Sequence, residues 1–169
     1  MGNQVHPTPL ISWIQQQIAQ YGQCGATKIT RVPRLAAAVP AVLGTEVQAP
    51  LLTWRDTGTV IAMYGQEIRG TQAAYAETEV RVQFAGDDDL INNGAAGDFA
   101  PMLALFGPNL NWFPIVRRVR RGDTWTITYK NGAANALTPS VLFAVLNDAD
   151  VGRMQREMDE ALRAQASAV

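Results

Sequence analysis

The stretch that most constrains this chain is residues 124–129, Thr-Trp-Thr-Ile-Thr-Tyr, in which small polar and large apolar side chains alternate strictly. This is the period of a β-strand with one buried face, so Trp125, Ile127 and Tyr129 are predicted to point into a core. Gly-Asp precedes the run and Asn-Gly follows it, and both dipeptides are turn signals. The stretch therefore predicts a β-sheet protein.

Short alternating or apolar runs recur along the chain at intervals of roughly 8–12 residues. The expected strands are residues 26–32, 45–47, 51–55, 59–64, 77–84, 112–119, 124–129 and 140–146, with 99–106 as either a strand or a short helix. Residues 56–58, Asp-Thr-Gly, predict a hairpin between two of them. Strands that do not alternate with helices favour an antiparallel β-sandwich or jelly roll over a parallel α/β fold.

Two helices are predicted, one near each end of the chain. Thr8-Pro9 is typical of a helix start, and apolar residues recur at helical spacing up to residue 21. Asp148 or Asp150 is expected to cap an amphipathic helix that runs toward the C-terminus. The expected organisation is an N-terminal arm and helix (1–24), a β-sandwich domain (25–147) and a C-terminal helix (148–169).

The chain has 169 residues, enough for one domain with a core of its own and too few for a second full domain. Only 17% of the residues are charged, against roughly 25% in soluble domains. Because interface cores are depleted in charge, this composition favours burial against other chains. A net charge of −1 argues against nucleic acid as a partner, and no apolar run reaches the length of a membrane span.

The one basic cluster consists of the four arginines before residues 124–129: Arg117, Arg118, Arg120 and Arg121. Arginine suits a docking site for a carboxylate-bearing partner, because its planar guanidinium can form two parallel hydrogen bonds with a carboxylate. The competing interpretation is pairing with Glu77, Glu79 or the aspartate-rich loop within the same sheet. Alternation along a strand also divides the arginines between two faces.

No catalytic set is predicted. The only histidine, His6, and the only cysteine, Cys24, lie on either side of the first helix, and nothing in the sequence brings them together. Residues 86–98 are rich in Asp, Asn and Gly, which suits calcium, but their spacing differs from that of an EF-hand. A solvated loop is the simpler interpretation, so no metal and no cofactor are expected. The tryptophans in the predicted strands are interpreted as core.

Three stretches carry a resemblance to a known class of proteins: residues 51–58 (Leu-Leu-Thr-Trp-Arg-Asp-Thr-Gly), 80–84 (Val-Arg-Val-Gln-Phe) and 121–127 (Arg-Gly-Asp-Thr-Trp-Thr-Ile). In style, residues 45–146 resemble small β-sandwich structural proteins of tailed bacteriophage particles, of the head decoration or cement type. The resemblance implies a homo-oligomer, a trimer or larger, that binds a major capsid protein or another virion protein. It implies a virion location after synthesis in the host cytoplasm, and it transfers no site residues.

Together with the lack of a predicted catalytic set, the resemblance implies a non-enzymatic structural protein that stabilises a capsid by bridging neighbouring subunits. Oligomer contacts are expected from the apolar faces of the two terminal helices: Leu10, Trp13, Ile14, Met154, Met158 and Leu162. Removing either helix is then expected to leave a folded sandwich that no longer assembles. The alternative is a β-sandwich module that binds carbohydrate or calcium, with Trp112 or residues 87–98 at its site.

Overall fold

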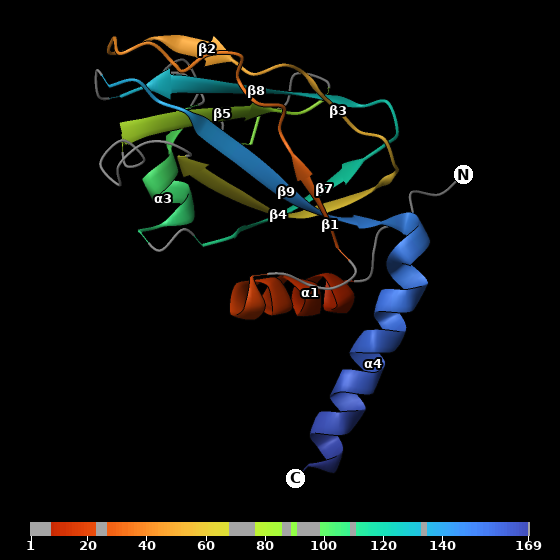
Figure 1. Cartoon of the computed structure of the whole chain (residues 1–169). Helices are drawn as coiled ribbons and strands as arrows, with labels where there is room; N and C mark the ends of the chain where they lie inside the picture. The colour runs from red at the N-terminus through yellow and green to blue at the C-terminus, as the bar shows by residue number, and fades with distance from the viewer. Residues whose placement is uncertain are drawn as a thin grey trace.

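The computed structural model describes residues 8–22, 27–67, 77–85, 89–90, 99–108, 111–132 and 135–168 (Figure 1). In this part of the chain the strands form two antiparallel sheets, with a helix toward each end of the sequence. The predicted mainly β, antiparallel fold with an N-terminal and a C-terminal helix is confirmed.

The first sheet has the strand order β1-β9-β4-β7. Its strands are β1 (Lys28–Arg31), β4 (Gly58–Glu67), β7 (Phe113–Val119) and β9 (Pro139–Asn147). β9 is buried on both faces, because Val141, Phe143 and Val145 belong to one core while Ala144 and Leu146 belong to another. A strand covered on both faces has no polar side, which explains the continuous apolar run in its sequence.

The second sheet is built around β8 (Thr124–Asn131). β5 (Thr78–Gln83) and then β6 (Ala100–Pro101) follow on one side, while β2 (Glu46–Gln48) and β3 (Leu52–Thr53) pair with β8 on the other. Trp125, Ile127 and Tyr129 are at most 1% exposed, as their alternation predicts. They share a core with the inner residues of β9, so this core lies between the two sheets.

The predicted hairpin across residues 56–58 is wrong. β3 pairs with β8 in the second sheet, where Leu52 lies opposite Trp125, whereas β4 pairs with β7 and β9 in the first. The Trp54 backbone N–H donates to the Asp123 carbonyl at 2.9 Å and extends the pairing of β3 with β8. The turn therefore carries the chain from one sheet to the other.

Two helices, α1 (Thr8–Tyr21) and α4 (Val151–Ser167), form a second core with the outer face of the first sheet (Figure 1). Its buried members are Leu10, Ile11, Ile14 and Ile18 of α1, Ile61 and Ala62 of β4, Ala144 and Leu146 of β9, and Met154 and Met158 of α4. The fold thus has two cores, one on each side of the first sheet.

Gln15 fixes α1 to an irregular point of β4. The pairing register of β4 shifts between Val60 and Ala62, as at a β-bulge, where ladder hydrogen bonds are locally disrupted. The side-chain amide of Gln15 donates to the Ile61 carbonyl at 2.9 Å. A buried carbonyl without a partner is costly, so this bond stabilises both the bulge and the position of the helix.

The start of α4 differs from the predicted side-chain cap. A short 3₁₀ turn, η2 (Asp148–Asp150), precedes the helix, and Asp150, the N-cap residue of α4, makes no capping hydrogen bond through its side chain. The Asp150 carboxylate instead accepts a hydrogen bond of 2.9 Å from Arg153. Residues 99–106 combine both predicted possibilities, since β6 is followed directly by the short helix α3 (Met102–Phe106).

Candidate functional site

Arg118, one of the four arginines predicted as a docking patch, bonds within the chain. Both of its terminal guanidinium nitrogens donate to the two carboxylate oxygens of Asp148, just before α4. This hydrogen bonding raises the pKa of Arg118 above its ordinary value, although partial burial opposes the shift. The pair joins β7 to the start of α4 and therefore serves the fold.

The other three arginines occupy different surroundings. The Arg117 guanidinium carbon lies 4.3 Å from the centre of the Phe84 ring, at a distance typical of cation–π contacts. β7 ends at Val119, so Arg120 and Arg121 lie in the turn before β8, and both are exposed. The four residues therefore do not share one strand face. Glu79, an expected partner of the arginines, has Lys130 Nζ 3.2 Å from its carboxylate.

Of the six residues expected to make oligomer contacts, Leu10, Ile14, Met154 and Met158 are buried in the chain's own second core. Trp13 is half-buried against that core, and Leu162 is 49% exposed. Removing α1 or α4 would uncover the outer face of the first sheet. The expectation that both ends can be deleted without loss of folding therefore does not fit this arrangement.

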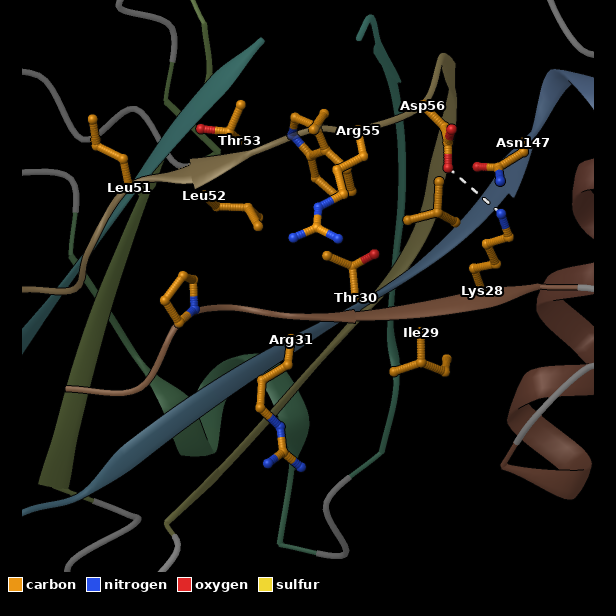
Figure 2. Close-up of a pocket in the computed structure, with 13 residues that line it drawn as sticks. Lys28, Ile29, Thr30, Arg31, Leu51, Leu52, Thr53, Arg55, Asp56 and Asn147 are labelled. Carbon is orange, nitrogen blue, oxygen red and sulfur yellow. Dashed lines mark hydrogen bonds and ion pairs between the residues drawn. The ribbon is translucent and has the colours of Figure 1, made fainter. Parts of the chain in front are cut away.

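A groove of about 700 Å³ lies between β1 and residues 51–56. Figure 2 shows Leu52 and Arg55 pointing from one wall toward β1, and Lys28 and Thr30 pointing from β1 toward the other wall. The side chains of Ile29 and Arg31 point to the opposite side of β1, and they form the outer rim of the groove. The groove thus opens where the edges of the two sheets meet.

The lining of this groove is basic in a chain whose net charge is −1. Its charged residues are Lys28, Arg31, Arg55 and Asp56. Lys28 Nζ lies 3.5 Å from an Asp56 carboxylate oxygen, but both side chains are more than half exposed, and such pairs contribute little stability. Among the described residues, Arg31 and Arg55 have no ion pair. Two cations therefore remain available to a bound carboxylate.

The interpretation of the tryptophans as core holds for Trp54 and Trp125, which are 4% and 1% exposed. Trp112 is different, because it is only half-buried and lines a second hollow of about 430 Å³. Tyr64 and Asn111 line the same hollow, and the Tyr64 and Trp112 ring centres lie 5.4 Å apart. This hollow combines aromatic rings with an amide side chain.

His6, Cys24 and nearly all of residues 86–98 lie outside the described residues, so the predictions made for them have no structural counterpart here. Within the ranges that the structure describes, no three His, Cys, Asp or Glu side chains gather closely enough to hold a metal ion. No helix in those same ranges has both the length and the apolar character to cross a membrane.

The groove residues were not predicted as a site. Lys28 and Arg31 belong to an exposed edge strand, and Arg55 comes 24 residues after Arg31 in a segment that was assigned to a hairpin. The only sequence signal was the Lys-Ile-Thr-Arg run, with basic residues on both sides of a β-branched pair. In comparisons with known proteins, no protein-family model and no curated protein matches this chain.

Proposed function

We propose that this chain is a non-enzymatic structural protein that self-associates and bridges neighbouring subunits of a larger assembly. The observation that carries the proposal is the apolar stripe of α4. Met154 and Met158 are buried against α1 and the sheet, and Leu162, the next residue at the same spacing, is 49% exposed. The stripe thus continues beyond the second core, and the described residues leave about half of the Leu162 side chain uncovered.

The distal half of α4 supports the same proposal. Beyond Met158, every described side chain except the half-buried Ala161 is exposed, and Figure 1 shows the helix extending away from the sheets. A helical segment this short is marginally stable in water without packing. A second copy that covers Leu162 would supply that packing, and the low charge of the chain favours such burial.

The resemblance to head decoration proteins of tailed bacteriophages suggests a capsid as the assembly and a major capsid protein as the partner. In such a protein the two sheets with their shared core would form an antiparallel β-sandwich or jelly roll. A trimer or larger ring bound at several points would gain affinity from multivalency, even where each contact is weak. The virion is accordingly the proposed location.

Leu162→Glu is expected to weaken self-association at least about tenfold, because a buried leucine contributes roughly 1.5–3 kcal/mol. Size-exclusion chromatography with light scattering measures the result: the wild type should have a multiple of the chain mass of 18.3 kDa, and the variant should shift toward that mass.

Ala164→Glu is the matched control, since residue 164 is exposed on the opposite side of the same helix and the change adds the same charge. It should leave the oligomer intact. A wild-type protein that stays at 18.3 kDa at high concentration would contradict the proposal, as would equal effects of the two variants.

The hollow beside Trp112 favours a second candidate function, carbohydrate binding. Half-buried aromatic rings beside an amide can stack on a sugar and bond to its hydroxyl groups. If this function is correct, a glycan array probed with the full chain should give signals that Trp112→Ala abolishes and Trp13→Ala, at another half-buried tryptophan, retains. Signals that survive Trp112→Ala would exclude this hollow as the sugar site.

A further inference from the structure

β1 presents a free backbone edge. It is the terminal strand of the first sheet, paired on one side with β9. The Val32 N–H donates to the Val141 carbonyl at 2.9 Å, and bonded and non-bonded pairs alternate along an antiparallel ladder. Thr30 and Lys28 therefore also direct their backbone groups toward β9. Ile29 and Arg31 direct theirs to the outer edge, where the described residues provide no partner.

The groove lies next to this edge. Lys28 and Thr30 point toward residues 51–56, and Leu52 and Arg55 point back toward β1 (Figure 2). A strand added beside β1 would place every second side chain over the groove and the others beside Ile29 and Arg31. Backbone bonds would then give affinity, while the groove and the rim would select side chains, as in other cases of strand addition.

We propose that β1 binds an extended, acidic segment of another polypeptide as an added strand. The charges select this occupant, because Arg55 on the groove side and Arg31 on the rim side both lack an ion pair among the described residues. Ile29 is 47% and Leu51 is 54% exposed, so apolar side chains of the segment would also have surfaces to cover. This site is distinct from the self-association proposed through α4.

The same charges disfavour a second copy of β1 as the occupant. Antiparallel pairing of two β1 strands through these outward backbone groups would set Ile29 of one copy opposite Arg31 of the other, so the two Arg31 side chains would be diagonal neighbours on one face. Diagonal neighbours are within reach of long side chains, and like charges placed there repel each other. Basic residues on an edge strand are a known means of preventing self-pairing, and they leave the edge open to a strand of opposite charge.

The test uses the full chain and two acetylated, amidated octapeptides, Gly-Glu-Val-Glu-Val-Glu-Val-Gly and its counterpart with lysine in place of each glutamate. Titration calorimetry should show the acidic peptide binding at least about tenfold more tightly than the lysine peptide. Its three glutamates share one face of the strand, so over the groove they would form opposite-charge pairs with Lys28 and Arg55 where the lysine peptide would form like-charge pairs. Arg55→Glu should weaken the acidic peptide by a similar factor. Arg163→Glu makes the same charge change on α4, far along the chain from the groove, and should not.

Amide hydrogen exchange followed by NMR then tests strand addition itself. With saturating acidic peptide, the Ile29 and Arg31 amides should exchange at least about tenfold more slowly, because they gain hydrogen-bond acceptors. The Lys28 and Thr30 amides, already paired with β9, should change little.

Three results would overturn the proposal: equal affinity for the two peptides, no binding at millimolar peptide, or binding that leaves the Ile29 and Arg31 amides unprotected. Protection of these amides that rises with protein concentration in the absence of peptide would also overturn it, since a second copy would then occupy the edge. Repeating the titration with Leu162→Glu separates the two proposals. Binding that persists in a monomeric variant supports the β1 site whatever the outcome for self-association.

Discussion

Trp125→Ala is expected to lower the free energy of unfolding by about 4 kcal/mol, because it removes a large ring from a closely packed core. The ring is 1% exposed and meets three aromatic neighbours edge to face, with centres 4.8 Å from Trp54, 4.6 Å from Phe84 and 5.2 Å from Phe143. Phe143 lies on β9 of the first sheet, Phe84 directly follows β5 of the second, and Trp54 lies in the connection from β3 to β4, so the cavity would open between the two layers. Urea denaturation followed by circular dichroism measures the loss.

Thr124→Ala is the control for this substitution. Thr124 precedes Trp125 on β8 and is exposed, so its truncation should change the free energy of unfolding by no more than about 0.5 kcal/mol. Trp125→Phe should fall between the two, because it keeps an aromatic ring and leaves a smaller cavity. A cost below about 1 kcal/mol for Trp125→Ala would mean that the ring does not organise this core.

The strands with one buried face were predictable because their periodicity follows directly from burial. β8 and β5 each alternate, and Trp125, Ile127, Val80 and Val82 lie in the shared core as expected. The prediction of a hairpin at residues 56–58 failed because of what a turn signal can report. A turn signal reports local backbone geometry only, and it does not specify which strand becomes the partner. Leu52 lies opposite Trp125 of β8, so its partner is a strand more than 70 residues further along the chain and not β4.

The two helices that form the second core could be predicted, but the packing of these helices against the first sheet could not. Helical spacing identified the apolar faces that contain Ile14 and Met158, but an apolar face alone does not say whether a sheet or another chain covers it. Ala144 and Leu146, the residues that β9 contributes to this core, lie in a continuous apolar run, which indicates burial on both faces but does not say what covers the outer face. Four of the expected oligomer contacts consequently became internal contacts.

The groove beside β1 could not be predicted from the sequence, because it depends on how the edges of the two sheets are placed relative to each other. Lys28 and Arg55 are brought together only when β3 pairs with β8 while β1 pairs with β9. The arginine cluster was visible in the sequence but less informative. β7 divides the first two of these arginines between its two faces, and Arg118 donates two hydrogen bonds to Asp148, a residue that the sequence predicts as a helix cap. The sequence shows where the basic residues are, but the topology of the sheets decides which of them are left without an ion pair and can bind a partner.

Gly65→Ala is expected to lower the free energy of unfolding by about 3 kcal/mol, because it overpacks a filled space. A Cβ atom at Gly65 would lie 2.2 Å from Cε2 of Phe106 and 2.6 Å from Cε of Met102. Both side chains are buried, so α3 would have to move away from β4. Alanine is intrinsically no worse than glycine in a strand, so the loss would report this steric contact. Urea denaturation gives its size.

Gly152→Ala is the matched control for this change, because it adds the same methyl group where there is space. The new Cβ would have only Arg156 Nη1 at 4.0 Å, and alanine is the better helix former, so stability should rise by up to about 1 kcal/mol. Phe106→Leu replaces the ring that lies against Gly65 with a smaller side chain. In the double variant it should therefore recover part of the stability that Gly65→Ala loses. If Gly65→Ala is neutral, or Phe106→Leu gives no coupling with it, α3 does not pack on β4 through this glycine.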